Sequence, residues 1–157
     1  MWAIAREIID ANLYMTLGTA DRDGQPWVSP VYFATADYTN FYWTSAPEAT
    51  HSRNLAERPR LSIVIFDSQA PPYHGRAVYL SAVAAELAGD DLDEGLTVYP
   101  GPRPGATSST RDQVTPPSPF RLYRATALEH SILCPREPRQ PCPLHGIAVD
   151  HRTTVSP

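Results

Sequence analysis

Residues 41–67 read FYWTSAPEATHSRNLAERPRLSIVIFD, and this stretch predicts a strand, a short helix and a second strand. Residues 41–44 are aromatic and β-branched, as a half-buried strand requires, and residues 61–66 are a nearly continuous apolar run of strand length. A polar segment separates the two runs. We therefore expect a ligand site where this polar segment meets the strands.

The polar segment predicts a helix of barely three turns. Ser45 and Glu48 fit a capping box, Thr50 offers a second N-cap, and the Arg58-Pro59 pair ends the helix. Its start would gather free N–H groups, hydroxyls and basic side chains, a combination suited to phosphate. A capped surface helix without a ligand explains the same residues, so both interpretations stay open here.

The flanking sequence continues the β-rich pattern. An N-terminal helix is predicted by Ile4, Ile8, Ile9 and Leu13, which recur at helical spacing. Further strands are expected at residues 14–20, 25–36, 76–87 and 120–133, with a short helix at 89–96 and a last short strand at 144–149. Six or seven short strands with few helices predict a mainly β (α+β) fold, an antiparallel barrel or a sandwich, and we favour the barrel because closure removes exposed edges.

Pro30 lies within the second predicted strand. Proline has no N–H to donate to a ladder, so this position is expected on an edge, at a bulge or where a ligand approaches the backbone. Ser29, Pro30 and Val31 are therefore candidate site residues.

Composition limits the function classes. The 157 residues are expected to form one domain, 1–157, with a proline-rich loop at 99–119 and a proline-rich C-terminal extension from residue 134. A net charge of −4 argues against nucleic acid as the main partner, and lysine is absent, which excludes Schiff-base chemistry. The apolar start is interrupted by charges and resembles no signal peptide, and no run is long enough to span a membrane, so we expect a cytoplasmic protein.

The two cysteines lie near histidines towards the C-terminus. Cys134 and Cys142, with His130, His145 and His151, show no CxxC pair and no HxxxH spacing, so free thiols and no metal site are expected. A nucleophilic pair of Cys142 and His145 has little support from its spacing. Motifs of hydrolases, P-loop proteins and dinucleotide-binding folds are absent from the sequence.

An ordered set of segments over residues 14–87 resembles the pyridoxamine 5′-phosphate oxidase-like family of flavin-binding split barrels. These segments are VSPVYF, FYWTS, HSRNL, RPRLSIVIFD and AVYLSAVA. The resemblance implies a six-stranded antiparallel split β-barrel with a few short helices, a homodimer, and FMN in a cleft at the interface. It implies that strand 27–31 lines the flavin ring, that Trp43, Thr44 and Ser45 contact the ribityl phosphate region, and that Thr50, His51, Ser52, Arg53 and Asn54 bind the phosphate.

The chain departs from the family pattern at the phosphate segment. Thr50 and His51 stand where members commonly carry an Arg-Lys pair, and Arg53 and a protonated His51 would replace these cations in part. The resemblance implies an FMN-dependent oxidoreductase acting on a small-molecule substrate, and it identifies no catalytic side chain. F420-dependent reduction and non-catalytic binding of flavin or haem are the alternatives.

Overall fold

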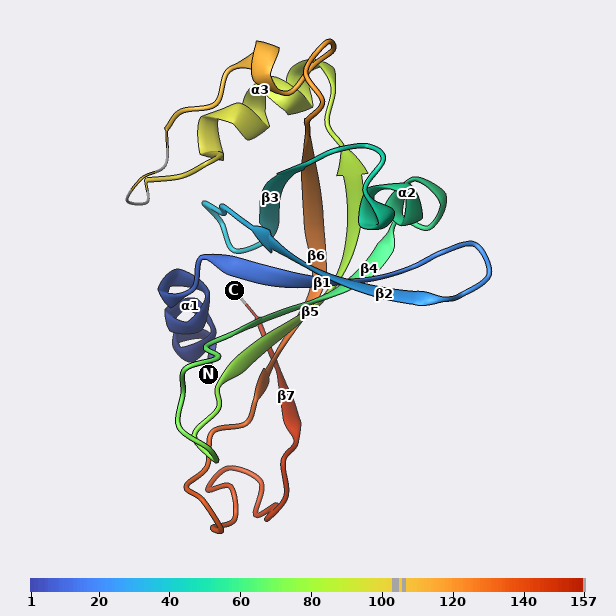
Figure 1. Cartoon of the computed structure of the whole chain (residues 1–157). Helices are drawn as coiled ribbons and strands as arrows, with labels where there is room; N and C mark the ends of the chain where they lie inside the picture. Colours follow the sequence, from blue (N-terminus) through green and yellow to red (C-terminus); the bar gives the residue numbers. More distant parts are fainter. Residues whose placement is uncertain (103–104, 106, 157) are drawn as a thin grey trace.

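The computed structural model describes residues 1–102, 105 and 107–156, and Figure 1 shows their course. In these residues the chain forms three α-helices, α1 (Trp2–Ala11), α2 (Thr50–Glu57) and α3 (Gly89–Val98), with one 3-10 turn, η1 (Arg111–Gln113). The seven strands are β1 (Tyr14–Ala20), β2 (Pro26–Tyr32), β3 (Asn40–Ser45), β4 (Arg60–Phe66), β5 (Ala77–Glu86), β6 (Arg121–Leu133) and β7 (Arg152–Val155). None of the helices in these ranges combines the length and apolar character that a membrane crossing needs.

One antiparallel sheet contains all seven described strands. Its order is β2-β1-β4-β5-β6-β3, and β7 pairs with the far end of β6. The sheet curls towards closure, but β2 and β3 are joined only by an isolated bridge between Ala34 and Tyr42. The predicted mainly β, antiparallel split barrel is therefore confirmed, with one more strand than the six expected.

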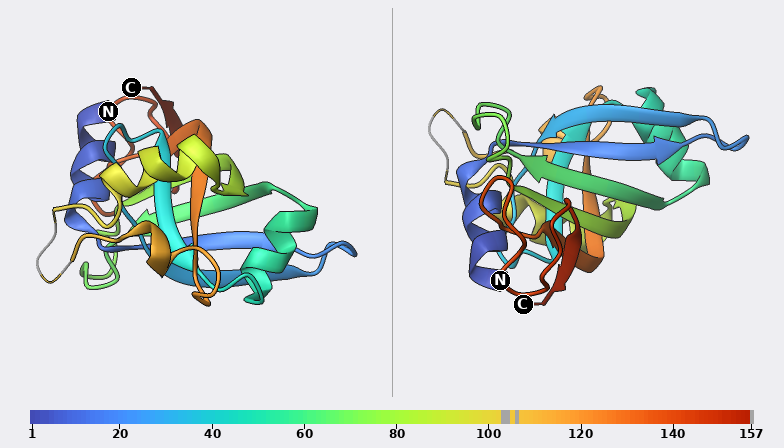
Figure 2. Two further views of the ribbon diagram at one scale, coloured as in Figure 1. Left: turned by 90° about the horizontal axis from the view of Figure 1, so that it is seen from above. Right: turned by 90° about the horizontal axis from the view of Figure 1, so that it is seen from below.

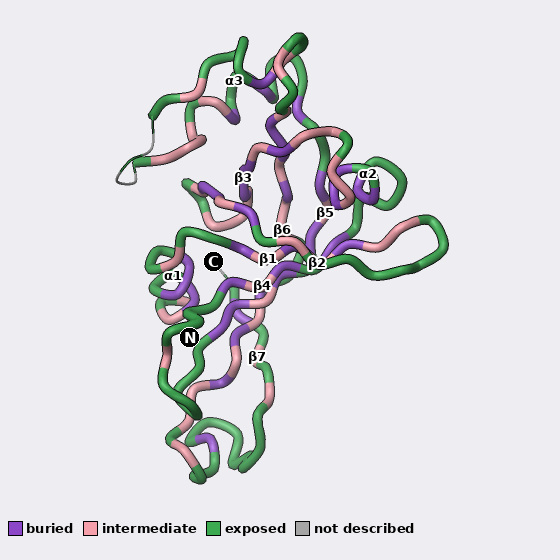
Figure 3. The backbone as a smooth tube through the Cα atoms, viewed as in Figure 1, coloured by how far each residue is buried: buried purple, intermediate pink, exposed green. Residues whose placement is uncertain are grey.

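The barrel interior holds the main hydrophobic core. Phe33, Phe41 and Trp43 are fully buried, and the Trp43 ring stacks on Tyr123 with centroids 5.5 Å apart. Helix α1 covers one end of this core with its buried face of Ala5, Ile8 and Ile9. Buried residues accordingly concentrate along the strands and on one face of α1 (Figure 3).

A second, smaller cluster packs α3 against the outside of β3 and β6. It consists of Tyr42, Leu87, Leu92, Val114 and Leu122. Gly95 allows the close approach, because a Cβ there would lie 2.8 Å from Leu87 and 3.0 Å from Leu122. Helix α3 lies at one end of the molecule, and the loop before β7 lies at the other (Figures 1 and 2).

Three local predictions were wrong. The second strand ends at Tyr32 rather than 36, and residues 144–149 form no strand; the last strand is the β-branched β7. The capping box of Ser45 and Glu48 does not form, because Ser45 is still part of β3 and buried. Helix α2 instead has Ala49 at its N-cap, without a side-chain cap.

Candidate functional site

Helix α2 turns its predicted phosphate residues in different directions. His51, Ser52 and Asn54 face the protein and are buried, whereas Arg53 is exposed and Thr50 is partly buried. His51 Nε2 lies 2.6 Å from Ser45 Oγ, which joins two of the predicted residues in one buried hydrogen bond. Burial lowers the pKa of His51 below its ordinary value. In the structure without a ligand, burial thus favours the neutral form of the His51 imidazole.

The other predicted residues are distributed over separate parts of the fold. Asn54 Nδ2 donates to Thr19 Oγ1 at 3.1 Å, which ties α2 to β1. Trp43 lies in the core, and Thr44 Oγ1 lies 3.0 Å from the Tyr99 hydroxyl. Thr44 also lines a cleft of about 760 Å³, together with Tyr32, Tyr99 and Phe120. Thr44 and Ser52 thus line two different clefts.

Strand β2 is one of the two edge strands of the sheet order, which is one of the three positions predicted for Pro30. In its antiparallel register, Ser29 and Val31 pair with Leu17 and Met15, whose side chains are buried in the barrel. Pro30 pairs with Thr16 and belongs to the opposite, outward face. Strand alternation thus leaves Pro30 alone of these three predicted residues on the outer face.

A row of small residues crosses this outer face. Gly18 on β1 pairs with Ser62 on β4, and Ser62 pairs with Ser81 on β5. Val28 on β2 and Glu129 on β6 extend the row on either side. Because Gly18 has no side chain and both serines are short, the middle of the row forms a shallow floor. Gly18, Val28, Ser62 and Ser81 line two adjoining hollows of about 420 and 440 Å³, which we call together the outer-face cleft.

Two arginines line the outer-face cleft. Arg60 borders one hollow and Arg152 the other. The Arg152 guanidinium lies 3.7 Å from the centroid of the Tyr79 ring, an arrangement that holds this cation over the sheet. The cleft therefore combines a shallow floor with one arginine in each hollow, and the Glu129 carboxylate shares the hollow of Arg152. The arginines suit a planar ligand that carries negative groups.

The residues of the outer-face cleft were not predicted from the sequence, although the sequence carries a signal for them. Gly18, Ser62 and Ser81 each interrupt a predicted strand with a small residue. Only the register shows that the three are direct neighbours, because a shift of one residue would move each of them to the other face.

Comparisons with known proteins agree with this fold. A sequence profile of the pyridoxamine 5′-phosphate oxidase family matches residues 1–133, and the chain belongs to this family. No functionally curated protein matches the chain.

Several solved structures share the architecture. A haem-binding protein from Mycobacterium smegmatis is 22% identical with a TM-score of 0.67, and the match covers 96% of this chain and 56% of that one. The chain therefore spans little more than half the length of the mycobacterial protein. HutZ, a haem storage protein from Vibrio cholerae, is 22% identical with a TM-score of 0.62, covering 78% of this chain and 86% of HutZ. An FAD-binding protein from Mesorhizobium loti is 22% identical with a TM-score of 0.61, covering 84% of this chain and 91% of that protein. Similarity at this level establishes the fold alone.

Proposed function

We propose that this chain is a flavin-dependent oxidoreductase of a small molecule, with FMN bound on the outer face of the sheet between two copies of the chain. The observation that carries the proposal is the row Gly18, Ser62 and Ser81, whose side chains leave a flat floor. A Cβ at Gly18 would stand 3.4 Å from the Ser62 carbonyl oxygen, so any larger side chain there would project into the cleft. A planar isoalloxazine ring fits such a floor.

The residues around the floor suit the chemistry of a flavin. When bound, a flavin supplies two-electron transfer, and the protein positions the ring, tunes its charge and excludes water. Ser62 and Ser81 offer hydroxyls to the polar edge of the ring. Arg152 would stabilise the negative charge of a reduced ring, and Arg60 would pair with the phosphate. A second copy over the exposed Val28 would shield the ring from water.

Haem is the second candidate, because two of the similar structures are named for haem binding or storage. Haem iron is held by His, Cys, Met or Tyr side chains. Among the described residues that line the outer-face cleft, Tyr79 alone is of such a type, and its ring lies under Arg152. A flavin needs no protein ligand of this kind, which favours FMN over haem.

The test is a titration of apo-protein with FMN, with the deazaflavin F420 and with haem, followed by absorbance and fluorescence. We expect FMN to bind most tightly and Gly18→Val to weaken it at least about tenfold, because the new side chain fills the floor. Ala85→Val adds two carbons at an exposed β5 position outside the outer-face cleft and should bind FMN normally. Tighter binding of haem, or equal FMN affinity in Gly18→Val, would contradict the proposal.

The same titration, repeated with arginine variants, tests which side chain binds the FMN phosphate. Arg60→Ala should weaken FMN more than riboflavin, which lacks the phosphate. A matching loss in Arg53→Ala, with none in Arg60→Ala, would instead place the phosphate at α2, as the sequence resemblance implies.

A further inference from the structure

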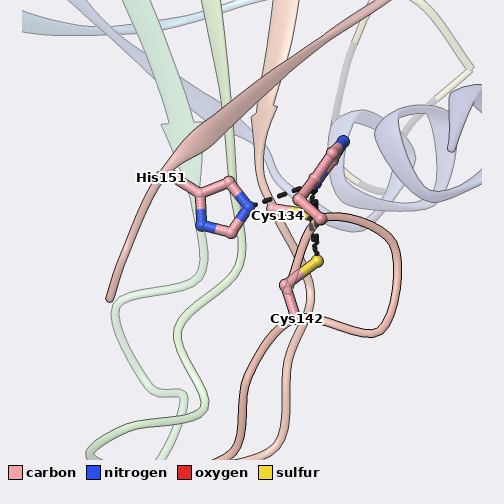
Figure 4. A group of neighbouring side chains, drawn as sticks. Cys134, Cys142 and His151 are labelled. Atoms are coloured by element: carbon pink, nitrogen blue, oxygen red, sulfur yellow. Dashed lines mark hydrogen bonds between the residues drawn. The ribbon is translucent and has the colours of Figure 1, made fainter. Parts of the chain in front are cut away.

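The loop between β6 and β7, residues 134–151, brings four side chains of metal-ligating type together. Cys134, Cys142, His145 and His151 each offer one ligand atom, and these four atoms all lie within 4.8 Å of one another. The two thiols are buried and are not joined in a disulfide. Figure 4 shows Cys134, Cys142 and His151 directed towards a common point. This loop lies beyond residues 1–133, which the family profile matches.

Three of the six distances between the ligand atoms are close to the edges of one tetrahedron. His145 Nδ1 lies 3.5 Å from each sulfur and 3.2 Å from His151 Nε2, and the sulfurs lie 3.1 Å apart. Around zinc, with bonds of about 2.3 Å to sulfur and about 2.05 Å to nitrogen, regular edges are about 3.6 Å for S to N, 3.3 Å for N to N and 3.8 Å for S to S. The two sulfurs must separate to admit the ion, and His151 Nε2 lies within 4.8 Å of both.

We propose that Cys134, Cys142, His145 and His151 bind one structural Zn²⁺ ion. Two thiolates and two imidazoles in tetrahedral arrangement are the donor set that zinc prefers, and four protein ligands leave no open position for catalysis. The spacing C-x7-C-x2-H-x5-H follows neither of the common zinc patterns, which is why the sequence alone predicts no site.

Groups around the four ligands already hold them in the orientation that a metal requires. His151 Nδ1 lies 2.9 Å from the Val149 carbonyl oxygen, and His145 Nε2 lies 3.4 Å from Thr153 Oγ1. Each imidazole thus has a partner for the nitrogen that faces away from the cluster, the arrangement that fixes metal-binding histidines. These contacts leave His145 Nδ1 and His151 Nε2 to the ion.

The surroundings of the Cys142 sulfur stabilise a negative charge on it. The Cys134 thiol and the backbone amides of Leu144 and His145 donate hydrogen bonds to this sulfur. Backbone amides that point at a sulfur stabilise the thiolate, which is the form that binds metal.

The loop has an Arg136–Asp150 ion pair and a few backbone hydrogen bonds but no apolar core of its own, so a crosslink would stabilise it. It contains four prolines and no helix or strand, and the large apolar side chains of Leu144, Ile147 and Val149 are exposed. Metal binding would supply folding free energy that an apolar core does not supply here. Since His151 directly precedes β7, the ion would also fix β7 against β6.

The first experiment is elemental analysis of the full chain, purified under reducing conditions without a metal-affinity tag. We expect one equivalent of zinc, lost in Cys142→Ser and in His145→Ala, of which the latter changes an exposed side chain. His74→Ala removes an exposed histidine outside the cluster and should keep its zinc. Replacement of zinc by Co²⁺ should give thiolate-to-cobalt charge transfer and the intense visible bands of a tetrahedral site.

The second experiment needs no variant. Trypsin treatment of wild type with a zinc chelator should speed cleavage after Arg136 and Arg139, both inside the loop, at least about tenfold. Cleavage after Arg22, exposed in the β1-β2 hairpin, is the internal control and should not change. Zinc-free wild-type protein that gives no tetrahedral cobalt spectrum, or a Cys134-Cys142 disulfide in the reduced preparation, would overturn the proposal.

Discussion

The inward orientation of His51 predicts that acid weakens the fold. Because burial lowers its pKa below the ordinary value of 6.5, the unfolded chain takes up a proton at a higher pH than the folded chain does. The contribution to the free energy of unfolding is therefore complete above about pH 6.5 and is lost as the pH falls towards the folded pKa.

His51→Gln tests this prediction, because glutamine can still bond to Ser45 but does not titrate. We expect a flatter dependence of the free energy of unfolding on pH in the variant, measured by urea unfolding at several values between about pH 8 and about pH 5. His74→Gln, at an exposed position, should follow wild type. Parallel profiles for His51→Gln and wild type would show that His51 does not titrate as proposed.

Thr153 provides a test of the metal site at a residue that is not itself a ligand. Its hydroxyl lies 3.4 Å from His145 Nε2, so Thr153→Val removes the partner that orients this imidazole. We expect zinc affinity to fall about 10-fold or more, as measured by competition with a coloured chelator. Thr154→Val makes the same change at the next, exposed position of β7 and should leave the affinity unchanged. Equal affinities in both variants would remove Thr153 from the site.

At the scale of elements, the packing of α3 depends on Gly95. A Cβ at this position would approach Leu87, Leu122 and Tyr42 within 2.8 to 3.2 Å. We expect Gly95→Val to reduce the free energy of unfolding by about 1–3 kcal/mol, because the added carbons force α3 away from β3 and β6. Thr97→Val, at an exposed position of the same helix, is the matched control. If Gly95→Val is as stable as this control, the side chains beneath α3 can move aside without lowering the free energy of unfolding.

Most elements were predictable from sequence because their apolar periodicity matches their burial. Strands β1, β4 and β6 alternate between core and surface, and α1 carries one apolar face. The last strand was misplaced because residues 144–149 look apolar, yet Gly146 has a φ of +67° and belongs to a turn. The strand forms instead at Arg152–Val155. There, backbone hydrogen bonds to β6 stabilise a strand although three of its four side chains are polar.

The candidate site was predictable only in part, since it depends on contacts between distant segments. The edge position of Pro30 followed from its missing N–H. The floor of Gly18, Ser62 and Ser81 depends on the register of three strands, and the cysteine and histidine cluster depends on how a loop of irregular backbone folds. Neither arrangement can be predicted from the spacing of apolar residues within one segment.

At the scale of the whole molecule, the proposed dimer makes a prediction for Val28. This side chain is 64% exposed beside the outer-face cleft, an unfavourable position for an apolar group in an isolated barrel. We expect wild type to sediment as a dimer at micromolar concentration and Val28→Glu as a monomer with weakened FMN binding. Leu128→Glu, at an exposed β6 position outside the cleft, should remain a dimer. A monomeric wild type would contradict an interface on this face.

Strand β2 leaves one edge of the open sheet uncovered, and two of its seven residues, Pro26 and Pro30, have no N–H. An uncovered edge with a full row of donors and acceptors recruits strands from other molecules and starts aggregation. The prolines interrupt that row, so the β2 edge of this chain is protected against pairing with strands of other molecules. Replacement of Pro30 by valine would restore a donor on the most β-prone part of the edge, and the protein should then form β-rich aggregates faster on storage.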